Sequence, residues 1–119
     1  MYNSGTISNL NNTSSVSAET ASSVEGNPIT NIYASGIYNS STGAIETLTN
    51  ADTGSITGSN YGIENYGTIT SLISSGTITG SSGSGIYNSG SIGALSNSGV
   101  ITGATNGVEN NSAITSLTN

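Results

Sequence analysis

GIYNSGSIGALSNSGVITGATN, residues 85–106, is a unit whose pattern of residue types recurs along the whole 119-residue chain. With Gly85 as coil position zero, isoleucine stands at positions one, seven and sixteen, asparagine at three and leucine at ten. Further copies begin at Gly36, Gly62 and Gly107, and a copy without its glycine begins at Met1. A period slightly above twenty residues is the signature of a solenoid, whose repeats bury an apolar face only by stacking.

Within each copy, isoleucine is flanked by small polar residues, as in Thr68-Ile69-Thr70 and Thr77-Ile78-Thr79. This alternation is typical of a half-buried strand, and the glycines and asparagines between such runs supply turns. Positions seven and ten are both apolar but three residues apart, so the backbone must bend between them for both to face the core. We predict an all-β fold, a right-handed parallel β-helix of about five coils with roughly 22 residues per coil. The right-handed sense is expected because each coil is longer than three hexapeptide repeats.

The alternative to a folded solenoid is a disordered segment rich in Ser, Thr, Gly and Asn. Disorder does not require apolar residues to recur in register. Here eleven of the fourteen isoleucines fall at positions one, seven or sixteen, and all five leucines fall at position ten. This regularity favours the solenoid.

A long insertion interrupts the pattern once. Residues 19–35, ETASSVEGNPITNIYAS, occupy a place that residues 104–106 alone fill in the clearest copy. A solenoid tolerates insertions at its corners because each coil contacts only its neighbours. We therefore predict one β-helix domain over residues 1–119 with an inserted loop at 19–35. The loop is either functional or a tolerated insertion with no role.

The composition excludes several classes of function. The chain has no Lys, Arg or His and six acidic residues, for a net charge of -6. Nothing neutralises phosphates, so we expect no nucleic-acid partner and no attraction to anionic membranes. No apolar run approaches the roughly eighteen residues of a membrane span, so we expect no membrane insertion. There is no cysteine and no calcium-binding GGxGxD run, and we expect neither a metal site nor a cofactor.

The asparagines at position three stand two residues after an inward aliphatic residue and should point inward as well. A buried amide needs partners, and like-on-like stacking lets each side chain bond the next one at the strand spacing of about 4.8 Å. We predict a structural asparagine ladder of Asn3, Asn39, Asn65, Asn88 and Asn110. A second ladder is predicted at position twelve from Asn12, Asn50, Asn97 and Asn119, with Ser74 substituting.

Position two lies between two inward positions and should face solvent. It carries Tyr2, Tyr38, Glu64, Tyr87 and Glu109 along the axis, and Tyr61 and Tyr66 lie close by in sequence. Tyrosine rings interleaved with carboxylates are what a glycan-binding face would use, although tyrosine is also a common solvent-facing strand residue. The binding candidates are therefore Tyr38, Glu64, Tyr87 and Glu109.

We expect no enzymatic activity. A polysaccharide lyase needs a basic residue or a metal cluster, and surface carboxylates such as Glu64 and Glu109 have no reason for the raised pKa of a general acid. Ice binding needs a flat array of threonines. Position seventeen carries Thr57, Thr79 and Thr102, but position fifteen carries Ser15, Ser55, Thr77 and Val100, which breaks the second column.

The motif GIYNSG, followed by SI, AL and NSGVITG, resembles the repeats of autotransporter-type passenger domains of bacterial outer-membrane and secreted adhesins. The resemblance covers the chain except residues 19–35. It implies a right-handed β-helix at the bacterial cell surface or outside the cell, serving as a stalk or as an adhesive surface for a host-surface or glycan ligand. Neither a signal peptide nor a translocator barrel is present in this sequence, so the chain would be an excerpt of a longer protein or a stand-alone relative.

The ends of the sequence raise a second possibility. The pattern begins near position one and breaks off at position twelve, without the polar or helical cap that normally protects a terminal coil. Open coils present unpaired backbone groups, and head-to-tail contacts between them are heterologous and do not close. The chain is therefore either cut from a longer solenoid or a self-assembling filament subunit.

Overall fold

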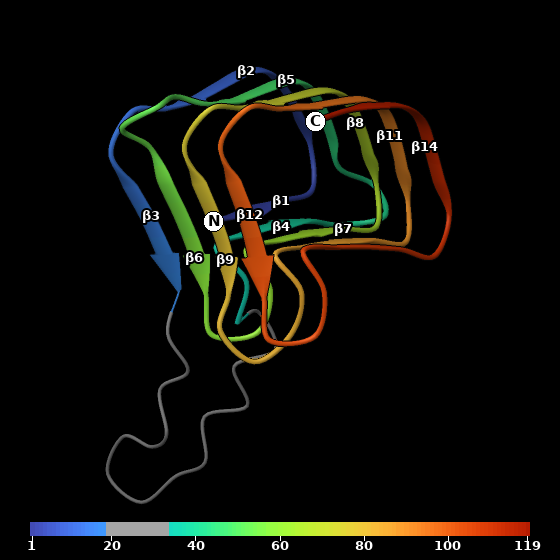
Figure 1. Ribbon diagram of the computed structural model, residues 1–119. Coiled ribbons are helices and arrows are strands. Elements are labelled where there is room, and N and C mark those ends of the chain that lie inside the picture. The colour runs from blue at the N-terminus through green and yellow to red at the C-terminus, as the bar shows by residue number, and fades with distance from the viewer. Residues whose placement is uncertain (19–33) are drawn as a thin grey trace, which may run out of the picture.

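The chain folds as a stack of parallel β-sheets that wind into a β-solenoid (Figure 1). The computed structural model describes residues 1–18 and 34–119, and it contains no helix in that part of the chain. There are about four turns of about 23 residues each. The predicted β-helix is confirmed. The expected count of about five coils is slightly too high, because it includes the partial copies at residues 1–18 and 107–119 as whole coils.

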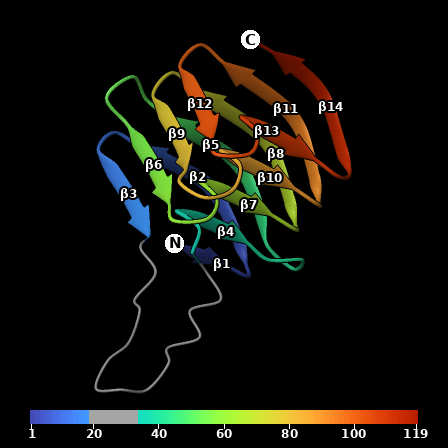
Figure 2. The same ribbon diagram turned by 60° about the horizontal axis from the view of Figure 1, so that its bottom comes forward.

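In the described residues three parallel sheets form the walls of the solenoid, and each coil contributes one strand to each wall in turn, except that the last coil contributes none to sheet C (Figure 2). Sheet A consists of β1 (Tyr2–Asn3), β4 (Ile37–Asn39), β7 (Ile63–Asn65), β10 (Ile86–Asn88) and β13 (Val108–Asn110). Sheet B consists of β2 (Thr6–Asn12), β5 (Ala44–Asn50), β8 (Thr68–Ser74), β11 (Ser91–Asn97) and β14 (Ala113–Thr118). Sheet C consists of β3 (Ser15–Ala18), β6 (Ser55–Gly58), β9 (Thr77–Gly80) and β12 (Val100–Gly103).

The strand register follows the repeat found in the sequence. Position one pairs Ile37 with Ile63, Ile63 with Ile86 and Ile86 with Val108. Positions seven, ten and sixteen pair like with like in the same way along sheets B and C. Because the side-chain period of a strand is two residues, a slip of one residue would turn every aliphatic side chain outward.

Sheet B bends where the sequence requires it. The pairing of β8 with β11 joins Ile69 to Ile92 and Leu72 to Leu95, but it passes over Thr70 and Gly93 between them. The pairing of β2 with β5 passes over the equivalent position. An unpaired residue of this kind lets a strand kink. Positions seven and ten can therefore both face the core although they are three residues apart.

The interior contains a column of aliphatic side chains. Among residues 1–18 and 34–119, eleven aliphatic side chains are fully or almost fully buried: Ile37, Ile45, Leu48, Ile56, Ile63, Ile69, Leu72, Ile78, Ile86, Ile92 and Leu95. Partly buried residues of the first and last coils extend the column: Ile7, Leu10, Val16, Ile101, Val108 and Ile114. Each coil thus stabilises its neighbours by covering their apolar surface, as expected for a solenoid.

Turns between strands depend on close backbone approach. A Cβ atom at Gly67 would collide with the carbonyl oxygens of Gly43 and Ser40 in the preceding coil. Glycine removes that clash and so lets successive corners stack. The insertion predicted at 19–35 stands between β3 and β4 in the sequence, and its residues 19–33 lie outside the described part of the chain. Within the described ranges, no helix is long and apolar enough to cross a bilayer.

Candidate functional site

The position-three asparagines form a hydrogen-bonded ladder along the inside of one corner. In each step the Nδ2 group of one asparagine donates to Oδ1 of the asparagine in the next coil, at 2.7–2.9 Å. The five members, from the first coil to the last, are Asn3, Asn39, Asn65, Asn88 and Asn110. Backbone carbonyl oxygens of neighbouring turns accept further hydrogen bonds from the same amides. The ladder satisfies buried polar groups, so its role is to hold the corner.

The position-twelve ladder is interrupted. Asn12 donates to Asn50 at 2.9 Å, Asn50 donates to Ser74 Oγ at 3.3 Å, and Asn97 donates to Asn119 at 2.8 Å. Across the described residues, Asn97 Oδ1 is buried without a hydrogen-bond partner. The serine side chain is shorter than that of asparagine and has no amide group to donate to Asn97.

The outer face of sheet A carries the predicted column at position two. Tyr38 pairs in register with Glu64, Glu64 with Tyr87 and Tyr87 with Glu109. The expectation that the whole column faces solvent is wrong for Glu64, which is only 8% exposed. Its carboxylate is covered because neighbouring side chains fold over it.

Five tyrosine rings form a chain of ring contacts on this face, which we call the tyrosine row: Tyr2, Tyr38, Tyr66, Tyr87 and Tyr61. Ring centroids of successive members are 5.6, 5.6, 5.9 and 4.9 Å apart. The pairs at the two ends are stacked, with interplanar angles of 9° and 29°, whereas the central ring is tilted by 45° and 55° to its neighbours. Such stacked and tilted pairs are favourable aromatic geometries.

Tyr66 bridges the gap that Glu64 leaves in the column, because it reaches across from the next corner. The Ser35 hydroxyl and the Tyr66 side chain both hydrogen-bond to the Glu64 carboxylate. Burial, together with the nearby charge of Glu64 and this hydrogen bond, raises the pKa of Tyr66 to about 12. Glu64 is therefore a buried acceptor held by two hydroxyl groups.

A diagonal contact links each coil to the next beside this column. The residue just before a coil glycine contacts the position-two residue of the following coil: Ser35 with Glu64, Tyr61 with Tyr87, and Ser84 with Glu109. Serine meets glutamate in two of these contacts and tyrosine meets tyrosine in the one between them. The contacts therefore alternate with a period of two coils.

Comparisons with known proteins give no relative from which a role could be transferred. No family model, curated protein or solved structure matches this chain. In residues 1–18 and 34–119 there is also no group of three or more acidic residues that could hold a metal ion. The tyrosine row with its carboxylates is therefore judged by its own chemistry.

Sequence reasoning selected Tyr38, Glu64, Tyr87 and Glu109 as binding candidates, and the structure brings all four onto one face. It did not assign roles to Ser35, Tyr61 and Tyr66. The sequence did contain a signal for Tyr66. It is the only tyrosine at position four of a coil, and its coil carries glutamate instead of tyrosine at position two.

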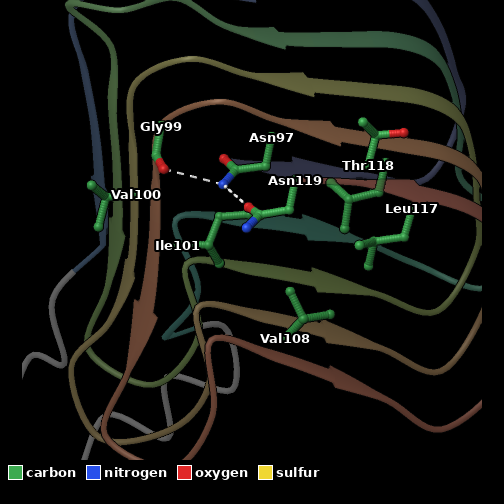
Figure 3. Close-up of a pocket in the computed structure, with 9 residues that line it drawn as sticks. Asn97, Gly99, Val100, Ile101, Val108, Leu117, Thr118 and Asn119 are labelled. Carbon is green, nitrogen blue, oxygen red and sulfur yellow. Dashed lines mark hydrogen bonds between the residues drawn. The ribbon is translucent and has the colours of Figure 1, made fainter.

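A second feature is a cavity of about 440 Å³ at the end of the solenoid formed by the last coil (Figure 3). Its lining combines core residues, such as Leu95, Ile101 and Val108, with the terminal pair of the second ladder, Asn97 and Asn119. Leu117 is 56% exposed beside it. This end shows apolar surface that every interior coil covers.

On sheet C the threonine column is in register, with Thr57 beside Thr79 and Thr79 beside Thr102. The neighbouring column ends in Val100, which is 55% exposed. The second hydroxyl column that an ice-binding face would need is interrupted at this residue.

Proposed function

We propose that this chain is a non-catalytic structural and adhesive β-solenoid that works outside the cell, as a segment of a bacterial surface or secreted adhesin. The observation that carries the proposal is the tyrosine row, an aromatic surface that runs along the solenoid axis. Tyrosine supplies large contact area and a polar hydroxyl at low conformational cost, and it is enriched at recognition surfaces. The resemblance of the repeats to passenger domains supports the same role.

The stack of sheets supports the structural half of the proposal. Tyr38 and Tyr87 lie on β4 and β10, strands that are hydrogen-bonded on both sides, so the spacing of these two rings is set by the backbone and not by a flexible loop. Glycans are the ligand class we propose, because the row offers apolar ring surface together with hydroxyl groups. A ligand that extends along the axis could contact several coils at once.

A glycan array and a cell-binding assay test this proposal. We expect the double variant Tyr38→Ala plus Tyr87→Ala to lose most of the binding of the unmodified chain. The matched control is Ile73→Ala plus Val100→Ala, which removes exposed apolar side chains from sheets B and C. Equal binding by the tyrosine variant and the unmodified chain would remove the tyrosine row from the proposal.

A second candidate is a filament subunit that stacks head to tail. The end cavity favours it, and so does the polarity of the asparagine ladder, in which each coil-to-coil step has the Nδ2 group of one coil donating to the next coil. The last coil therefore presents donors where the first coil presents acceptors, and such heterologous contact would not close. Light scattering and electron microscopy at rising concentration test this candidate. Fibres one coil wide would support it, and a stable monomer would refute it.

A further inference from the structure

Tyr66 differs from the other members of the tyrosine row in how its ring is used. The Tyr2–Tyr38 and Tyr61–Tyr87 pairs stack, so their rings cover part of each other. Tyr66 is tilted to both of its neighbours and is 38% exposed. The ring at the centre of the row is therefore partly exposed between two tilted neighbours, where a ligand can contact it.

A carboxylate lies beside this ring, at its hydroxyl end. Glu64 is buried, and no side chain of the chain carries a positive charge that could neutralise it. Its hydrogen-bond partners are hydroxyl groups, from Ser35 and Tyr66. A buried carboxylate is normally paired with a cation, so this one leaves a negative potential at the surface above it.

The two features reinforce each other for a cationic ligand. The face of an aromatic ring attracts a cation through its quadrupole, and the attraction grows when the site is partly shielded from water. The phenol of Tyr66 is hydrogen-bonded to a carboxylate, which adds electron density to its ring. Glu109 is the second carboxylate in the column, one coil beyond Tyr87, and no described side chain opposes its charge with a positive one.

We propose that Tyr66, with Glu64 beside its hydroxyl group and with Tyr38 and Tyr87 as neighbouring rings, is a subsite for the ammonium group of an amino sugar within a bound glycan. This inference rests on the proposed adhesive function and names its ligand class. An amino-sugar polymer fits the surface because it is extended like the row, has hydroxyl groups for the phenols, and carries a charge opposite to that of Glu64. A basic polypeptide shares only the charge.

The test compares two probes with the same backbone. One is a β-1,4-linked hexamer of glucosamine, which carries ammonium groups, and the other is the fully N-acetylated hexamer, which is neutral. Calorimetry at about 0.15 M salt, where exposed charges more than about 8 Å apart are screened, measures both affinities. We expect the unmodified chain to bind the glucosamine hexamer about tenfold more tightly, in line with the strength of a partly desolvated cation–π contact.

Variants assign that preference to the subsite. Glu64→Gln keeps the size of the side chain and removes its charge, and it should abolish the preference for the glucosamine hexamer. Glu46→Gln is the matched control, because it removes one charge from an exposed position on sheet B and should keep the preference. Tyr66→Leu keeps an apolar side chain beside Glu64 but removes the aromatic ring, and it should also lose the preference. This variant tests the subsite if Glu64→Gln fails to fold.

The outcomes separate this inference from the adhesive proposal. If the acetylated hexamer binds and the glucosamine hexamer binds no more tightly, the ammonium subsite is refuted and the glycan surface stands. If neither hexamer binds, the proposed glycan function fails as well. Tighter binding of hexalysine than of either hexamer, with the same dependence on Glu64, would overturn the amino sugar in favour of a basic polypeptide.

Discussion

Asn65 stands at the middle of the asparagine ladder, and replacing it by alanine tests how much the ladder stabilises the fold. It is fully buried, accepts a hydrogen bond from Asn39 and donates one to Asn88, both at 2.8 Å. After Asn65→Ala, Nδ2 of Asn39 still has the carbonyl oxygens of Gly43 and Thr68 as acceptors. Oδ1 of Asn88 loses the donor that the ladder supplies.

The size of the effect follows from these partners. Two side-chain hydrogen bonds contribute about 1 kcal/mol each, and a buried acceptor left without a donor costs about 1–3 kcal/mol more. We therefore expect Asn65→Ala to lower the free energy of unfolding by about 3–5 kcal/mol. Asn110→Ala is the matched control, because Asn110 is exposed at the end of the ladder and water replaces its contacts. It should cost about 1 kcal/mol.

Urea denaturation followed by circular dichroism measures both variants under one condition. The midpoint should fall further for Asn65→Ala, with an unchanged slope if the unfolded chain is equally exposed. If the free energies of unfolding of the two variants differ by less than about 1 kcal/mol, the ladder stabilises the fold no more at its centre than at its end. The stabilising role argued from its geometry would then be refuted.

Two further predictions concern the core and the tyrosine row. Leu72→Asp places an unpaired charge at a fully buried position and should give a random-coil circular dichroism spectrum. Ile73→Asp, at the adjacent outward position, should stay folded. A folded Leu72→Asp variant would contradict the register. Tyr66 has a pKa of about 12 in the folded chain against about 10 in the unfolded chain, so folding favours its neutral form. The contribution of this shift to stability is therefore full below pH 10 and is lost as the pH rises toward 12. Phenolate absorbance should show a late phase near pH 12 that Tyr66→Phe lacks, and titration of every native tyrosine near pH 10 would count against the contact with Glu64.

The fold could be predicted from the sequence because one period controls every part of it. Leucine at position ten and isoleucine at seven and sixteen are buried for the same reason in each coil, so a single alignment gives the register of all three sheets. The bend in sheet B was also predictable, because two inward residues three apart cannot lie on one face of a straight strand.

The candidate site was less predictable because it depends on contacts that the period does not contain. In/out alternation places Glu64 on the outer face, but it does not show that Tyr66 reaches across from the next corner and covers it. The same holds for Ser35, which stands within the predicted insertion and yet is buried against the first regular coils. The position of a side chain that crosses between columns depends on its length and on the space that side chains of the neighbouring coil leave unfilled.

The alternating diagonal contacts restrict how this solenoid can change in length. Removing one coil, residues 62–84, would set Ser35 opposite Tyr87 and Tyr61 opposite Glu109, so a hydroxyl would face a ring and a ring would face a carboxylate. Removing residues 62–106 would instead restore a contact between serine and glutamate. Gain or loss of repeats in pairs therefore keeps the outer surface complementary, and the unit that duplication or protein engineering should copy is two coils, although the core repeats with every one.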